Sequence, residues 1–355
     1  MFYSLFLYFS VLTSVSILNY LNYKYYYKGI FIFMSFYILL LLASIRYNIG
    51  TDYSNYSAIF NEIKYGIEVH TEIGYYYLNK GVIFLNLPFE TVIFISSLLI
   101  LIFIYKSVSR KYLMLFIFLY ISSNSYFQSL SLIRQALAIS IALYAVSNIY
   151  KSGFLKYLLW ILFASSFHLS AILYLPIYFL RKLPITYIYA FLLIIWFYIV
   201  MNTDIINFII NTILPMTPYG IYVGGKYFTK EIMLGSGLGV AFRLIIGFII
   251  LLYSSKIRKK FPEANILLLL LFIYEVSYIL SLKIYIFNRL ADTFSLFFIF
   301  IIPYFVYSFN RKILQKSITI FFIFIFLILM YKNLSNDYYQ VSGGVGVMPY
   351  KSLLY

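Results

Sequence analysis

The 355-residue sequence contains no cysteine, only two histidines and only eleven acidic residues. Without cysteine, neither a disulfide, a thiolate nucleophile nor a cysteine-ligated metal can belong to this protein. Charged residues make up 11% of the chain, whereas hydrophobic residues make up 63%. A soluble fold of this length could not bury so much apolar surface around one core. The sequence therefore predicts an integral membrane protein.

Long hydrophobic runs recur along the whole chain. A bilayer core about 30 Å thick needs about 20 apolar residues in a helix. We expect no cleaved signal peptide, because the first run lacks a basic segment before it and a small-residue cleavage site. The runs predict an all-α polytopic membrane protein with about eleven to twelve transmembrane helices, folded as one membrane-embedded domain over residues 1–355. The clearest runs lie at residues 3–18, 30–45, 91–105, 185–200, 238–253, 266–282, 290–307 and 318–331.

Basic residues outnumber acidic residues by 27 to 11, and their positions explain the excess. One alternating set of loops holds most of the basic residues and a single acid, Glu263, whereas the other set is nearly neutral. By the positive-inside rule the basic loops face the cytoplasm, which places the N-terminus outside. The excess is then a topology signal, and we expect no nucleic-acid binding. The basic loops lie around residues 24–28, 106–111, 151–156, 181–182, 256–260 and 311–316.

Two large connectors fall on the outer side in this topology. Residues 46–90 contain two stretches with aromatic and aliphatic residues at helical spacing, which predict two amphipathic helices at the membrane surface. Residues 202–237 are rich in glycine and proline and predict a mobile lid. Residues 122–131 carry no charge and predict a short outer loop. Residues 155–180 fit one span or a hairpin; the hairpin is favoured because it keeps the following basic pair on the cytoplasmic side.

Several ionisable side chains lie within or at the ends of the apolar runs. Each costs about 2.5–3.5 kcal/mol near the bilayer centre, so such residues are usually functional. In the predicted topology they all lie toward the outer surface, which predicts an outward-facing polar pocket formed with the extracytoplasmic helices and loops. They are Arg134, Arg243, Glu275, Arg289 and Asp292, together with His168 at the turn of the hairpin.

Structural roles would also account for these residues. The heads of Arg134 and Arg243 would reach the membrane interface from several residues inside a span. Glu275 would pair with a nearby basic residue, and His168 would be a hydrogen-bonded core histidine. Asp52 would cap the helix that follows it. The other charges of the first connector are assigned to a solvated face, namely Glu62, Lys64 and Glu68.

Several arginines directed at one pocket indicate anion recognition. Guanidinium groups pair bidentately with phosphate oxygens and stay charged in a low-dielectric site, which suits a lipid-linked pyrophosphate. A neighbouring carboxylate or imidazole suits a general base that activates a hydroxyl. The GGVGV segment at 343–347 follows no strand and opens no helix, so it does not predict a dinucleotide site. Asp52 and Glu72 are the most suitable pair for a divalent ion, but the carboxylates are few and scattered, and we expect no metal and no other cofactor.

Four segments resemble those of the EpsG/Wzy type of bacterial polysaccharide polymerase. They are RYNIGTDYSNY at 46–56, LIRQALA at 132–138, FHLSA at 167–171 and NRLADTF at 288–294, and they occur in the order of the family. The resemblance implies a multi-pass glycosyltransferase of the bacterial inner membrane. It joins oligosaccharide repeat units into O-antigen, capsule or exopolysaccharide on the periplasmic face. The donor is carried on undecaprenyl pyrophosphate, and a chain-length regulator and a flippase are candidate partners.

The resemblance and the pocket together suggest roles for individual residues. We expect the base to be His168 or Asp52, with His168 favoured because an imidazole titrates near the working pH. Arg243 and Glu275 rest on their burial alone, whereas most of the others match a motif. Pyrophosphate binding is assigned to Arg46, Arg134, Arg243 and Arg289. Substrate binding is assigned to Tyr53, Tyr56, Gln135, Glu72, Glu275 and Asp292.

Three other functions remain open at this point. A flippase or exporter of lipid-linked oligosaccharide would also bury arginines, but its polar residues should line both leaflets, and the cytoplasmic half of these spans is nearly free of charge. An O-antigen ligase would use the same donor and differ only in its acceptor. A membrane O-acyltransferase would need a deeply buried histidine, which a histidine in the outer leaflet does not match.

Overall fold

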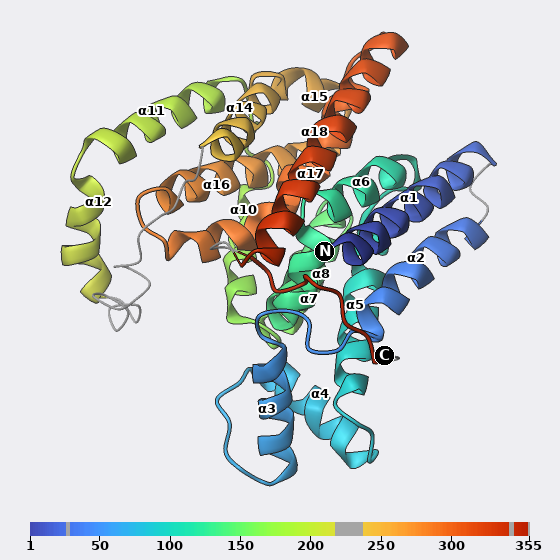
Figure 1. Ribbon diagram of the computed structural model, residues 1–355. Helices are drawn as coiled ribbons and strands as arrows, with labels where there is room; N and C mark the ends of the chain where they lie inside the picture. Colours follow the sequence, from blue (N-terminus) through green and yellow to red (C-terminus); the bar gives the residue numbers. More distant parts are fainter. Residues whose placement is uncertain (26–28, 217–236, 341–343, 354–355) are drawn as a thin grey trace. The chain divides into compact units, whose positions relative to one another are not determined.

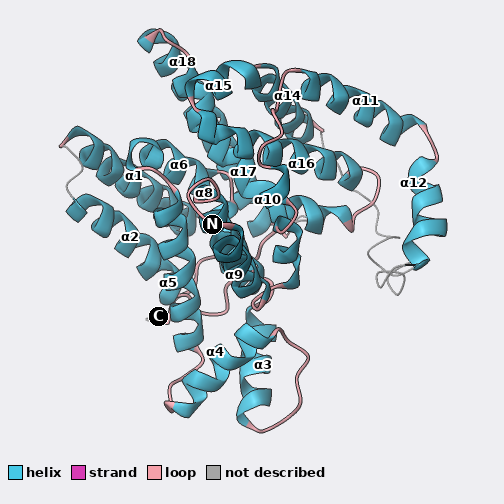
Figure 2. Ribbon diagram, turned by 180° about the vertical axis from the view of Figure 1, so that it is seen from behind, coloured by secondary structure: helices cyan, strands magenta, loops and turns pink. Residues whose placement is uncertain are grey.

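The computed structural model describes residues 1–25, 29–216, 237–340 and 344–353 (Figure 1). In these ranges the chain is helical, and its only strand-like pairing is an isolated bridge between Arg46 and Ser352. Figure 2 shows the same helices from behind, with no strand drawn. The predicted all-α class is confirmed. The chain divides into two compact units, Met1–Phe179 with Lys316–Tyr355 and Leu180–Gln315, and each is described by itself.

Unit 1 is built from helices that pack in pairs, several of which are not consecutive in the sequence. The pairs α1–α2, α2–α5, α5–α8 and α8–α9 contact one another, and α1 also packs against α6. The helices are α1 (Phe2–Lys24), α2 (Gly29–Ser44), α3 (Tyr53–Lys64), α4 (Ile73–Phe84), α5 (Glu90–Ser107), α6 (Arg110–Ser122), α7 (Ser125–Ser131), α8 (Ile133–Ser147), α9 (Phe154–Ser165), the 3-10 helix η1 (Leu169–Tyr174), α10 (Ile177–Leu180) and α18 (Lys312–Tyr338).

Unit 2 is centred on α16 and α17, which pack along each other and are mostly buried. Leucine and phenylalanine side chains fill the contact between these two helices. Helices α11 and α14 pack against α16. The helical segments are α11 (Ile188–Asn202), α12 (Ile205–Phe208), η2 (Ile209–Ile213), η3 (Leu214–Met216), α14 (Leu238–Leu252), α15 (Ser254–Lys260), η5 (Pro262–Ala264), α16 (Asn265–Ser281) and α17 (Phe287–Ser308).

Each long hydrophobic run forms a helix, as predicted. Among the described residues, five helices are long and apolar enough to cross a bilayer by themselves, and up to eight if each of three bent helix pairs is one span. Shorter apolar helices, among them α2, α8 and α9, make up the other predicted segments. The outer face of α18 exposes Ile320, Phe324 and Ile328, which suits a helix in contact with lipid. The protein is therefore a multi-pass membrane protein. That it forms a single domain stays a prediction.

The prediction of an outer loop at residues 122–131 is wrong. Asn124 has a left-handed backbone (φ 76) that ends α6, and a new helix, α7, begins at Ser125 after a bend of 57°. Tyr126 and Leu130 are buried there. The segment lacks charge because it is packed inside the unit, and a lack of charge fits a buried helix as well as a short loop.

The hairpin predicted for residues 155–180 is confirmed. Helix α9 ends at Ser165, and η1 returns along it after a turn that contains His168. The hydroxyl of Tyr157 in α9 donates to the carbonyl oxygen of Tyr174 at the end of η1, over 2.7 Å. This buried bond holds the two arms together.

The first large connector contains two helices, as predicted. Tyr53, Tyr56 and Phe60 form the buried side of α3. Lys64 and Glu68 are exposed, as predicted for a solvated face, whereas Glu62 is half-buried. That these helices lie at a membrane surface stays a prediction. The lid predicted at residues 202–237 falls largely on residues 217–236, which lie outside the described residues.

Candidate functional site

The loop between α2 and α3 is fixed to the end of α7, directly before α8. The backbone N–H of Thr51 donates to Ser131 Oγ (2.9 Å), and the two hydroxyls lie 2.6 Å apart. Gly50 (φ +101) lies so close that a Cβ atom would be 2.7 Å from the carbonyl oxygen of Leu130. Only glycine permits this conformation and this approach. The segment at 46–56 therefore lies against the residues directly before the segment at 132–138.

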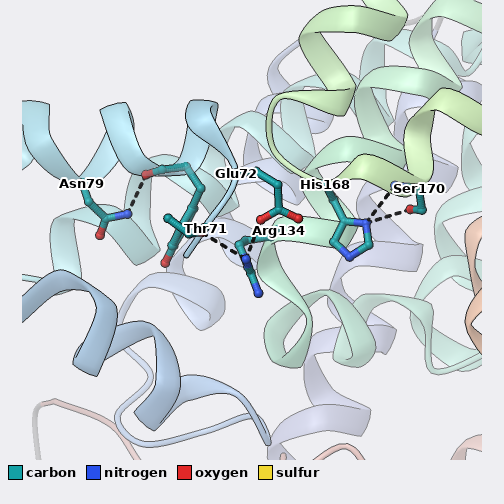
Figure 3. A network of polar contacts seen from close by, with 7 residues as sticks. Thr71, Glu72, Asn79, Arg134, His168 and Ser170 are labelled. Carbon is teal, nitrogen blue, oxygen red and sulfur yellow. Dashed lines mark hydrogen bonds and ion pairs between the residues drawn. The ribbon is translucent and has the colours of Figure 1, made fainter. Parts of the chain in front are cut away.

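Arg134 lies in the first turn of α8 and pairs with a carboxylate from the segment before α4. Its Nη1 donates to Glu72 Oε2 (2.5 Å) and to Thr71 Oγ1 (3.1 Å) (Figure 3). The guanidinium carbon lies 5.8 Å from the centre of the Tyr56 ring and 5.8 Å from that of Tyr75. Both partners of the ion pair keep about a quarter of their side-chain surface exposed (25% and 24%). Arg134 is thus a positioned cation that solvent can still reach.

The two tyrosines beside Arg134 remain uncharged. Burial raises the pKa of Tyr56 to about 12; the charge of Asp52 adds to the rise, and Arg134 opposes it. Burial also raises the pKa of Tyr75. Neutral phenol rings attract the guanidinium through their faces, so they hold the cation without cancelling its charge.

His168 lies in the turn between α9 and η1, close to the segment that carries Glu72 (Figure 3). The N–H of Gly74 donates to the carbonyl oxygen of Ser166 (2.7 Å), and a Cβ on Gly74 would be 2.4 Å from Ser166 Oγ. The imidazole Nδ1 accepts the backbone N–H of Ser170 (3.3 Å) and lies 2.8 Å from Ser170 Oγ. In the neutral ring the proton is then on Nε2, so the imidazole donates from that atom.

Arg46 is enclosed, with 1% of its surface exposed. Its Nη1 donates to the carbonyl oxygen of Ala43 (2.9 Å), while Nε and Nη2 have no hydrogen-bond partner among the described residues. Burial lowers the pKa of Arg46 to about 10, so the side chain is still a cation at neutral pH. The structure therefore covers a residue that the sequence predicts to bind an anion.

The remaining predicted residues of unit 1 surround this loop. Asp52 precedes α3 and is half-buried, but its side chain makes no capping hydrogen bond, so the capping alternative lacks its defining contact. Tyr53 is buried against the ring of Phe89, with centroids 5.4 Å apart. Gln135 follows Arg134 on α8 and is half-buried. Glu72 binds Arg134.

A second polar cluster lies in unit 2. The guanidinium of Arg243 on α14 lies 4.9 Å from the centre of the Tyr278 ring and interacts electrostatically with Glu275 and Asp292. Glu275 on α16 is fully buried, and neither carboxylate oxygen has a hydrogen-bond donor among the described residues. A Cβ on Gly247 would be 2.0 Å from Glu275 Oε1, so this glycine admits the carboxylate. Arg243 is therefore an electrostatic neighbour of Glu275, with no hydrogen bond between them among the described residues, and the pairing of Glu275 with a basic residue stays a prediction.

Two further predicted residues lie in the first turns of α17. Arg289 is exposed and Asp292 is half-buried. Because these residues and Arg243 belong to unit 2, while Arg46, Arg134 and His168 belong to unit 1, the single pocket predicted from the sequence stays a prediction.

Comparison with protein families identifies the family of the chain. The model of the EpsG family matches residues 29–352, which include all four segments quoted above. The chain belongs to the EpsG family. No curated protein and no solved structure matches it. Membership of the EpsG family fits a general role in polysaccharide polymerisation.

Several residues around the site of this EpsG-family protein have no signal in the sequence. Thr71 and Ser131 are ordinary polar residues, and only the fold shows that they bind Arg134 and Thr51. Asp337, at the end of α18, accepts three backbone N–H groups from the C-terminal segment. The sequence shows only that Asp337 lies six positions before Gly343, where the glycine-rich segment begins.

Proposed function

We propose that the protein is a glycosyltransferase that polymerises lipid-linked oligosaccharide repeat units from an undecaprenyl-pyrophosphate donor. The observation that carries the proposal is the half-buried Arg134, held between two neutral tyrosines and Glu72. Its hydrogen bonds to Glu72 and Thr71 both use Nη1, and Tyr56 is a further hydrogen-bonding neighbour. A quarter of the side-chain surface stays exposed, and a phosphate oxygen would approach there. A cation positioned in this way stabilises the negative charge that grows on the pyrophosphate as the glycosidic bond breaks.

The proposed reaction is a substitution at the anomeric carbon. The bond from that carbon to the phosphate oxygen breaks while the acceptor hydroxyl oxygen bonds to the same carbon. The hydroxyl proton passes to a carboxylate, for which we propose Asp52, and undecaprenyl pyrophosphate leaves. His168 was the favoured base from the sequence, but its Nδ1 already accepts a backbone N–H. We therefore assign the imidazole a donor role, through Nε2, toward the leaving phosphate.

The donor role of His168 predicts different outcomes for two substitutions. In His168→Asn the amide oxygen replaces Nδ1 as the acceptor for Ser170, so the turn should stay folded, while the donor at Nε2 is lost. We expect polymerisation to fall about 100-fold with no change in thermal unfolding. His168→Ala should lose the same activity and also about 1 kcal/mol of stability. A His168→Asn protein that polymerises at the wild-type rate would exclude the donor role.

The direct test uses purified protein in lipid vesicles with lipid-linked repeat units as the only substrate. A ladder of longer lipid-linked chains, formed without a nucleotide sugar, is the expected result. Transport of the repeat unit across the vesicle membrane without bond formation would instead establish a flippase. Transfer to an added lipid A acceptor without a ladder would establish a ligase.

The proposal includes the location and partners of the enzyme. The site would face the periplasm at the inner membrane, where the lipid-linked donor is exposed after it has been flipped. A flippase would supply the donor, and a chain-length regulator would set when the polymer is released. The positive-inside distribution of the basic loops supports this orientation.

A further inference from the structure

The C-terminal segment, residues 344–353, lies on the loop that carries Arg46. We call it the C-terminal cover. The N–H of Gly50 donates to the carbonyl oxygen of Gly346 (2.8 Å), and that of Tyr47 to the carbonyl oxygen of Lys351 (3.0 Å). Arg46 and Ser352 face each other in an isolated antiparallel bridge. The last residues of the chain are thus paired, backbone to backbone, with the first motif of the site.

Side-chain hydrogen bonds also attach the cover. The carboxylate of Asp337 accepts the N–H groups of Gly346, Val347 and Met348, over 2.6 to 2.8 Å. The hydroxyl of Tyr8 donates to the carbonyl oxygen of Val347 (2.6 Å), and that of Tyr350 to the carbonyl oxygen of Leu42 (2.9 Å). All of these bonds involve a segment that forms no helix or strand. Segments of this kind open at a lower free energy than packed helices.

The group beneath the cover is in an unfavourable environment. Arg46 has two N–H groups, Nε and Nη2, with no acceptor among the described residues. Its electrostatic neighbours are the phenols of Tyr126, Tyr53, Tyr350 and Tyr56, which are neutral. A buried cationic donor without an acceptor is costly, and native structures retain such groups where a ligand or an ion supplies the acceptor.

Arg46 and Arg134 share two of their neighbours. Tyr56 and Tyr75 each interact electrostatically with both guanidinium groups. The two arginines therefore belong to one cluster, of which Arg134 is the exposed member and Arg46 the covered member. An anion with two phosphate groups has oxygens for more than one guanidinium group.

We propose that the C-terminal cover moves to admit a pyrophosphate anion to Nε and Nη2 of Arg46, so that the cover gates the donor site. The proposal rests on the proposed function, because it takes the donor headgroup as the anion. In the closed state the donor reaches Arg134 alone. In the open state the pyrophosphate accepts hydrogen bonds from Nε and Nη2 of Arg46. The free energy of these bonds offsets the loss of the hydrogen bonds to the cover.

A thiol introduced under the cover tests its movement without relying on polymerisation. Met348 is 8% exposed, and the chain has no cysteine, so Met348→Cys carries a single, covered thiol. We expect slow labelling by a maleimide and a several-fold faster rate when inorganic pyrophosphate is added. The exposed Lys351→Cys should label quickly at a rate that pyrophosphate does not change. Adding Arg46→Gln to Met348→Cys should remove the response. A Met348→Cys rate that does not respond to pyrophosphate would overturn the proposal.

A reversible tether tests whether the movement is needed. Tyr47 and Lys351 are exposed and lie opposite each other beside the bridge, where paired Cα atoms are about 5.5 Å apart, within the disulfide range. Oxidised Tyr47→Cys/Lys351→Cys protein should form at least tenfold less polymer, and reduction should restore it, while each single variant stays active. A normal ladder from the oxidised protein would overturn the gate.

The two proposals can fail separately. If the untethered protein forms no polymer but the Met348→Cys thiol still responds to pyrophosphate, the polymerase proposal fails and the gate stands. If the protein polymerises while the thiol does not respond, the gate fails and the polymerase proposal stands.

Discussion

Replacing Arg134 with glutamine is expected to lower polymer formation about 100-fold or more, while the protein still folds. The guanidinium is the exposed cation of the cluster, and removing one preorganised donor from the charge that grows in a transition state costs about 10² to 10³ in rate. Arg134→Lys keeps the charge but loses the planar fork, so it should recover only a small part of the activity. The measurement is ladder formation from lipid-linked repeat units, alongside thermal unfolding in detergent.

The partner of Arg134 supplies the matched control. Glu72→Gln keeps a hydrogen-bond acceptor for Nη1 but removes the carboxylate. We expect a loss well below that of Arg134→Gln, because Glu72 orients the arginine and does not touch the phosphate. If the double variant polymerises as fast as Arg134→Gln alone, the two residues act together in the same step. Full activity in a well-expressed Arg134→Gln protein would exclude the proposed mechanism.

Replacing Asp337 with alanine is expected to cause the largest loss of stability, about 3–5 kcal/mol. Its carboxylate accepts three backbone N–H groups, two of them buried bonds, and hydrogen bonds to a charged group contribute about 1.5–3 kcal/mol each before non-additivity. The measurement is thermal unfolding in detergent, together with proteolysis of residues 344–353.

Two variants bracket the Asp337 result. Asp337→Asn keeps one oxygen as an acceptor and should fall between alanine and the wild type. Glu68→Ala removes an exposed carboxylate and should change stability by less than about 0.5 kcal/mol. If Asp337→Ala unfolds like the wild type and its C-terminal segment stays resistant to protease, Asp337 does not hold the cover.

The helices could be predicted from the sequence, because a helix that crosses a bilayer needs a long apolar run. The sequence was also sufficient for the hairpin at residues 155–180, since the basic residues beyond it restrict the topology. The sequence did not distinguish a buried helix from an exposed loop at residues 122–131, because neither of them needs charged residues. The left-handed Asn124 that separates α6 from α7 is a local conformation that composition does not reveal.

Residues of the site could be predicted only where a charged residue interrupts an apolar run of the sequence. Arg134 was found in that way, and its motif supported it. Its ion pair with Glu72 was not found, because 62 residues separate the two and only the path of the chain brings them together. The enclosure of Arg46 depends on backbone hydrogen bonds from Gly50 and Tyr47 to the carbonyl oxygens of Gly346 and Lys351, and such bonds leave no pattern in side-chain identity.

The C-terminal cover also has a consequence for biosynthesis. Unit 1 is assembled from residues 1–179 and 316–355, and the serine hydroxyl of Ser4 accepts a bond from Tyr350, 346 positions later. The loop that carries Arg46 is therefore synthesised early but closed only after residues 344–353 have left the ribosome. A nascent or prematurely terminated chain would present an open cation where the completed protein has a covered one, and quality-control proteases could recognise unfinished copies by that difference.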